Sequence, residues 1–192
     1  MKRVVAGLVL VLLSGVAARA AEDFWGGAAP KPAAPVRSAG GGLAEVESLE
    51  AALAEAWEKT PLTQRHVVFV AEKAALYGAY TERPSRVFAK GEDLVTYLEP
   101  IGFTWKADAD GVNHFGFVLD FTVKSRDGKV LAGQDGFQRF DFASRYKNRE
   151  VFMNITMSLN GIEPGDYVLG YTLHDRNGNK VSRFEQPFAI KE

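Results

Sequence analysis

Cations and aromatic rings alternate around residue 145, and the residue types of this segment are the best suited to ligand or partner binding in the chain. Arg139, Arg145, Lys147 and Arg149 carry the positive charges, and Tyr146 stands among them. Cationic groups beside aromatic faces suit an anionic glycan, a lipid headgroup or an acidic partner. These five residues are the predicted interaction site. The alternative is a long hairpin connection whose rings pack inward while its cations are solvated and partly neutralised by neighbouring acids.

Residues suited to catalysis are sparse. His66, His114 and His174 are scattered, and no Gly-x-Ser-x-Gly elbow, His-Glu-x-x-His motif or glycine-rich phosphate loop accompanies them. The chain contains no cysteine, which excludes a disulfide framework, a thiolate zinc site and a cysteine nucleophile. We therefore predict that the protein is not an enzyme and has no cofactor, no catalytic residue and no metal ligand.

Residues 108–113, Asp-Ala-Asp-Gly-Val-Asn, are similar to the first half of a calcium loop. A calcium ion needs about six or more oxygen ligands, and this segment lacks both a third early carboxylate and a closing bidentate glutamate. The sequence therefore favours a polar turn over a metal site.

The first twenty residues have the pattern of a secretory signal. Lys2 and Arg3 precede an apolar run over residues 4–17, and Ala18-Arg19-Ala20 follows as a small-x-small cleavage pattern. The run is shorter than the roughly 20 residues of a membrane span. We predict that residues 1–20 are a cleaved signal peptide and that the mature protein is soluble, periplasmic or secreted, without a membrane span. Retention on an uncleaved signal is the alternative.

Charge narrows the choice of partners. The 23 Lys and Arg residues nearly balance the 24 Asp and Glu residues, and loss of residues 1–20 would shift the formal charge from -1 to -4. This balance argues against nucleic acid, which is bound by clustered cations. Export without cysteine fits a bacterial envelope protein, because small eukaryotic secreted domains are usually rich in disulfides.

The N-terminal third contains a predicted tether and a predicted helix. Residues 21–42 are rich in Ala, Pro and Gly and should form a flexible tether. Residues 43–60 should form an amphipathic helix that ends where Thr60 precedes Pro61. Its apolar stripe consists of Leu43, Val46, Leu49, Leu53 and Trp57. A lone helix of this length is marginal in water, so we expect it to dock on its own domain or on a partner.

From residue 64 onward the hydrophobic period changes from that of a helix to that of strands. Residues 115–123 and 151–159 alternate between apolar and polar positions, and the turns at residues 126–129 and 176–179 have hairpin chemistry. Many strands separated by turns and no further helix predict an antiparallel sandwich over residues 64–192.

A local motif carries a resemblance to a known fold. Residues 162–167, Ile-Glu-Pro-Gly-Asp-Tyr, resemble the tyrosine corner of immunoglobulin-like and fibronectin type III sandwiches, although the fibronectin type has one more residue between Gly and Tyr. Residues 167–175 with Gly178 and residues 188–190 are similar to the closing hairpin of bacterial Ig-like envelope domains. The resemblance implies an all-β, antiparallel Ig-like β-sandwich preceded by one amphipathic helix. Such sandwiches serve adhesion, assembly and ligand presentation.

These features together predict a non-catalytic exported envelope module that acts through protein–protein interaction. It would use a sheet edge or the loop around Arg145, and its partner would be another envelope protein. The alternative is a periplasmic protein that binds a small anionic ligand or glycan with the basic aromatic loop. The lack of a recognisable nucleophile, metal or cofactor motif favours the first function.

Overall fold

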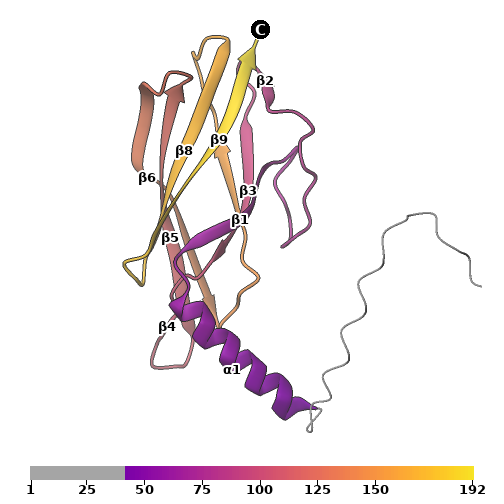
Figure 1. Ribbon diagram of the computed structural model, residues 1–192, viewed down its shortest axis with the longest axis vertical. Coiled ribbons are helices and arrows are strands. Elements are labelled where there is room, and N and C mark those ends of the chain that lie inside the picture. The colour runs from indigo at the N-terminus through magenta and orange to yellow at the C-terminus, as the bar shows by residue number, and fades with distance from the viewer. Residues whose placement is uncertain (1–41) are drawn as a thin grey trace, which may run out of the picture. The chain divides into compact units, whose positions relative to one another are not determined.

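The computed structural model describes residues 42–192. The predicted signal peptide and all but the last residue of the predicted tether lie outside the described residues. The described elements are α1 (Leu43–Lys59), β1 (Thr63–Phe69), β2 (Val87–Ala89), β3 (Leu94–Ile101), β4 (Lys106–Ala107), β5 (Asn113–Ser125), β6 (Val130–Ser144), β7 (Met153–Met157), β8 (Gly165–Asp175) and β9 (Val181–Lys191) (Figure 1).

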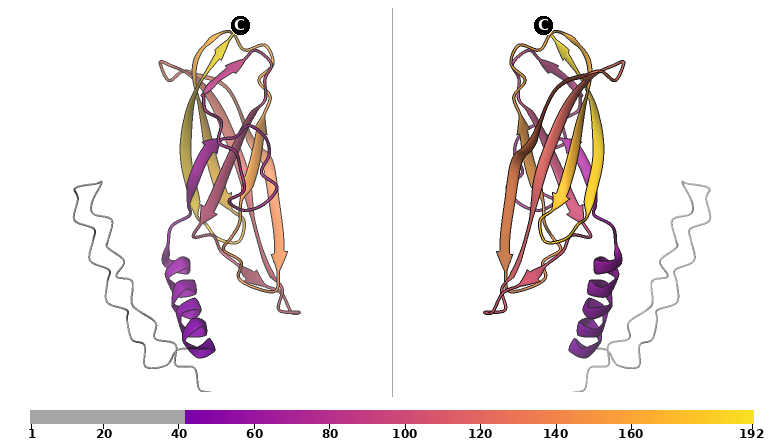
Figure 2. Two further views of the ribbon diagram at one scale, coloured as in Figure 1. Left: turned by 90° about the vertical axis from the view of Figure 1, so that its right-hand side faces the viewer. Right: turned by 90° about the vertical axis from the view of Figure 1, so that its left-hand side faces the viewer.

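Helix α1 covers the residues whose periodicity predicted a helix. Glu45 in its first turn and Lys59 in its last turn complement the helix dipole. The helix ends at Thr60, whose backbone is extended ahead of Pro61. The helix extends past the end of the sheets, and of its residues only Trp57 is buried (Figure 1 and Figure 2).

Two unequal sheets enclose the main core. The smaller sheet has the order β1-β3-β7, and the larger has the order β2-β9-β8-β5-β4, with β6 also pairing β5. Alternate residues of the long strands face the space between the sheets. Fully buried members of this core include Leu94, Leu98, Phe117, Leu119, Ile155, Leu169 and Leu173. Burial of these apolar side chains is the main stabilising term for the domain.

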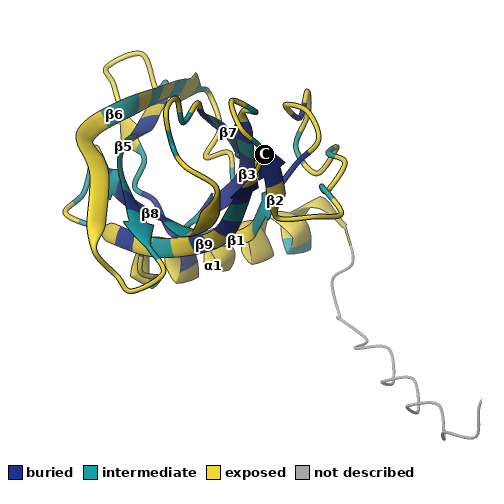
Figure 3. Cartoon of the chain, turned by 90° about the horizontal axis from the view of Figure 1, so that it is seen from above, coloured by how far each residue is buried: buried dark blue, intermediate teal, exposed yellow. Residues whose placement is uncertain are grey.

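The prediction of an antiparallel Ig-like sandwich is wrong. The described residues are mostly strand with one helix, but β2 pairs with β9 in parallel, and the larger sheet curls towards a half-barrel (Figure 3). Register shifts between Leu119 and Phe121 and between Val123 and Lys124 interrupt the β5–β6 ladder, and such bulges bend strands. Alternation along a strand reports which face is buried, not the direction of its neighbour, so the sequence pattern did not reveal the parallel pair.

The tyrosine corner forms locally even though the arrangement of the sheets differs from the expected one. The Tyr167 hydroxyl donates a hydrogen bond to the backbone oxygen of Glu163 at 2.6 Å. This contact is the one that the motif predicts, and it fixes the entry of the chain into β8.

Among residues 42–192 there is no helix with both the length and the apolar character needed to cross a membrane.

Candidate functional site

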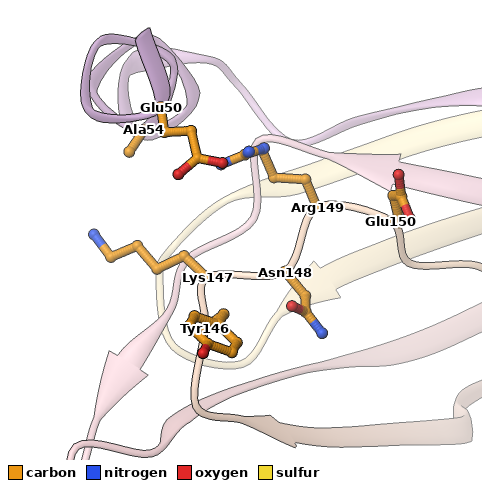
Figure 4. A pocket seen from close by; sticks show the side chains of 7 residues that line it. All are labelled: Glu50, Ala54, Tyr146, Lys147, Asn148, Arg149 and Glu150. Carbon is orange, nitrogen blue, oxygen red and sulfur yellow. The ribbon is translucent and has the colours of Figure 1, made fainter. Parts of the chain in front are cut away.

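A groove of about 600 Å³ lies between α1 and the segment that follows β6 (Figure 4). Seven residues line it, namely Glu50, Ala54, Tyr146, Lys147, Asn148, Arg149 and Glu150. Glu50 and Ala54 come from the helix, and the other five come from residues 146–150. Three residues of the predicted interaction site, Tyr146, Lys147 and Arg149, therefore share one groove.

The other two predicted residues lie elsewhere. Arg139 is not in a loop, because it lies on β6 opposite Val118 of β5. The next pair along the ladder, Phe117 and Phe140, packs into the core, so Arg139 points to the other side of the sheet, away from the core. Arg145 immediately follows β6, and its backbone oxygen accepts a hydrogen bond from Asn113 Nδ2 at 3.2 Å. The structure thus brings together three of the five residues and separates Arg139 from them.

The last turn of α1 is held by an aromatic cluster. Trp57 Nε1 donates to the Phe103 backbone oxygen at 2.9 Å, and the Trp57 ring lies 5.2 Å from the Phe103 ring in an edge-on arrangement. The Trp57 and Trp105 ring centroids are 5.4 Å apart. A large aromatic ring that is buried and whose ring nitrogen is also hydrogen-bonded makes a strong anchor, so this end of the helix is fixed to the sheets.

Lys180 adds a second anchor at the same end. Its ammonium donates to three backbone oxygens, those of Glu58 at 2.9 Å, Thr60 at 2.8 Å and Gly102 at 2.7 Å. The last carbonyls of a helix lack partners within the helix and carry its negative dipole end, so a cation there is doubly favourable. Lys180 lies 120 residues from Thr60, and no local sequence pattern indicates this contact.

Lys147, which lines the groove, links residues 146–150 to the helix. Lys147 Nζ donates to Glu58 Oε1 at 3.0 Å and lies 5.7 Å from the centre of the Trp105 ring. The hydrogen bond from Lys147 lowers the pKa of Glu58 below its ordinary value. Trp105 Nε1 donates to the Asn148 backbone oxygen at 3.2 Å, so the same ring ties down the loop.

The rest of α1 is unusually apolar for an exposed surface. Leu43, Val46, Leu49 and Leu53 are 73%, 52%, 64% and 47% exposed, respectively. They lie on the same stripe as the buried Trp57 and continue it beyond the sheets. The helix also carries five glutamates against one lysine, whereas residues 145–149 carry three cations and no acid. The site therefore combines an uncovered apolar stripe with acidic and basic surfaces side by side.

Asp108 belongs to a turn, as its spacing predicted. Its Oδ1 accepts hydrogen bonds from the backbone nitrogens of Asp110 at 3.0 Å and Val112 at 2.9 Å, and its Oδ2 lies 2.7 Å from His114 Nε2. The contact with His114 lowers the pKa of Asp108. In the described part of the chain, no group of three or more acidic, histidine or cysteine side chains is placed to hold a metal ion.

A buried carboxylate on the smaller sheet is the densest polar cluster that the sequence did not indicate. Glu99 Oε2 accepts from Arg65 Nε at 3.1 Å and from the Tyr77 hydroxyl at 3.0 Å, and Oε1 accepts from the Tyr97 hydroxyl at 2.8 Å. Burial raises the pKa of Tyr97 far above its ordinary value. Because both carboxylate oxygens are satisfied, this network holds the segment around Tyr77 against the sheet. The half-exposed ring of His66 lies beside it, with Nε2 3.9 Å from Glu99 Oε2.

Comparisons with known proteins return little. No protein-family model matches the sequence, and no curated protein matches it. One solved structure that is similar is an alkylpurine DNA glycosylase, AlkC, from Pseudomonas fluorescens, bound to DNA containing an abasic site analog. The identity is 12%, the TM-score is 0.36, and the match covers 69% of this chain and 31% of the glycosylase. At this level of similarity the likeness carries no argument about fold or function.

The sequence predicted an exported envelope module that acts through protein–protein interaction. The matched structure is that of a DNA glycosylase and gives this prediction no support. That function and its alternative, ligand or glycan binding by the basic aromatic loop, are not carried forward.

Proposed function

We propose that this protein is a self-associating domain and that α1 is its dimerisation helix. The observation that carries the proposal is the row of four large apolar side chains, Leu43, Val46, Leu49 and Leu53, left in water on one face of a single helix. Contiguous exposed apolar surface of this kind marks interaction sites, because its burial is favourable by about 25 cal/mol per Å².

The anchoring of α1 supports this role. Trp57 and Lys180 hold the C-terminal turn through four hydrogen bonds to the backbone, so the stripe is presented in one direction. A helix that is ordered before association loses less conformational entropy when it binds. The rest of the helix makes few contacts with its own domain, which leaves the stripe free to pack against a partner.

The charges favour a second copy of the same chain as that partner. A two-fold interface is self-complementary, because each patch on one subunit meets its counterpart on the other. On each chain the glutamates of α1 and the cations of residues 145–149 lie on either side of the apolar stripe. If two copies pack their stripes together in opposite orientation, the glutamates of each helix lie near the cations of the other copy. Glu50 and Arg149, which face each other across the groove, lie at this boundary (Figure 4).

The test is the molar mass of the purified chain by light scattering, compared with that of the double variant Leu49→Glu and Leu53→Glu. The variant should be monomeric while its circular dichroism spectrum stays unchanged, since both side chains are exposed in the single chain. Its Tm should lose only the contribution of association and should no longer depend on protein concentration. Ala51→Glu is the matched control, because Ala51 is exposed on the same helix but off the stripe. A dimer that survives the double variant, or a parent chain that is monomeric, would contradict the proposal.

A further inference from the structure

The outer face of the larger sheet is polar over most of its length. His174 Nε2 lies 2.6 Å from Asp120 Oδ2, and Lys124 Nζ lies 2.7 Å from Glu185 Oε1. These pairs face away from the core, as expected for the solvated face of an antiparallel arrangement. The charged groups of these two pairs satisfy each other, so neither pair offers a free group to a ligand.

The pattern changes at the end of the sheet remote from α1, where β2, β8 and β9 lie together near the C-terminus (Figure 1). Val87 of β2 pairs with Ala189 of β9, and Val168 of β8 pairs with Pro187 of β9. These four apolar residues help to line a hollow of about 360 Å³ on the outer surface. Because strands are spaced about 4.8 Å apart, the apolar floor is about 10 Å wide across the three strands.

Two arginines and one carboxylate, that of Asp166, also line the hollow. Arg86 precedes β2, and Arg126 follows β5 in the next hairpin turn. Arg126 Nη1 lies 3.4 Å from Asp166 Oδ2, and both side chains are largely exposed, so this pair is weak. Within residues 42–192 the guanidinium of Arg86 makes no ion pair with a carboxylate, so it is free to bind an anion.

We propose that this hollow binds an aliphatic chain that ends in a carboxylate, as in a free fatty acid. The chain would lie on Val87, Val168, Pro187 and Ala189, and the carboxylate would accept hydrogen bonds from Arg86. Apolar lining with a few placed polar groups is the usual composition of a small-molecule site, and a guanidinium matches the two oxygens of a carboxylate. This site is independent of α1 and of self-association.

Titration of the full chain with dodecanoate, followed by amide NMR, tests the proposal. The expected result is saturable shifts at Val87, Val168 and Ala189, and an affinity at least about tenfold weaker in Arg86→Gln. Arg183→Gln is the matched control, because Arg183 is exposed on β9, on the same sheet face, but does not line the hollow. Both Arg86 and Arg183 are exposed, so neither change should alter folding.

A second pair of ligands separates anion recognition from adhesion of an alkyl chain. Dodecyltrimethylammonium has the same chain with a cationic head, and acetate has the carboxylate without the chain. The proposal predicts no saturable shifts at these amides with either compound. Equal binding of the cationic amphiphile, unchanged affinity in Arg86→Gln, or no shifts with dodecanoate would overturn it.

Discussion

Replacement of Lys180 by methionine gives a sharp test of how α1 is fixed. Methionine keeps an unbranched apolar side chain but removes the ammonium that donates to the backbone oxygens of Glu58, Thr60 and Gly102. A hydrogen bond that involves a charged group contributes about 1.5–3 kcal/mol, and water can replace part of this at a half-exposed site. We therefore expect the free energy of unfolding to fall by about 2–3 kcal/mol in total.

Thermal unfolding followed by circular dichroism measures this effect. A change of 1 kcal/mol shifts Tm by about 2–4 °C in a domain of this size, so the expected decrease is roughly 5–10 °C. Lys73→Met is the matched control, because Lys73 is exposed and makes no side-chain hydrogen bond with any described residue. A decrease in Lys180→Met no larger than that of the control would refute the claim that this ammonium anchors the helix.

Two further predictions concern the same end of α1. Because Lys147 lowers the pKa of Glu58, the pair stabilises the fold fully at pH values above the ordinary glutamate pKa. This contribution is lost as the pH falls through the lowered pKa of Glu58. Lys147→Met should return the Glu58 pKa to its ordinary range in a carbon-detected NMR titration, and no change would show that the pair is absent in solution. Gly102→Ala should lower the unfolding free energy by about 2–4 kcal/mol in denaturant titrations, since Gly102 has φ +76° and an added Cβ would lie 2.5 Å from the Pro61 oxygen. Gly111→Ala shares the positive φ without the clash, so an equal loss there would contradict this account.

The sequence predicted the features that depend on local pattern. The stripe from Leu43 to Trp57 indicated α1, and the Pro-Gly corner indicated the hydrogen bond of Tyr167. The alternation over residues 115–123 indicated the core face of β5. In each case neighbours in the chain decide the structure, so composition and spacing are sufficient.

Features that depend on distant partners were not predicted. Arg139 and residues 145–149 were treated as one basic loop, yet pairing with β5 draws the chain as far as Ser144 into β6, which a register shift and a positive φ at Gly136 interrupt. The three-residue strand β2 is too short to carry a pattern, and its parallel partner lies about a hundred residues later. Arg139 was assigned to the loop because the pairing of β6 with β5 is not visible in the sequence. The contacts of Lys180 were missed because backbone carbonyl partners leave no mark in the sequence.

The distance between two α1 helices in solution tests self-association most directly. The chain has no cysteine, so Ala51→Cys carries a single spin label at an exposed position off the stripe. Packed helices lie about 8–10 Å apart, so dipolar spectroscopy should give a defined label-to-label distance of roughly 15–35 Å. That distance should vanish when Leu49→Glu and Leu53→Glu are added. A label that shows no dipolar coupling at about 100 µM protein would contradict the assignment of α1 as a dimerisation helix.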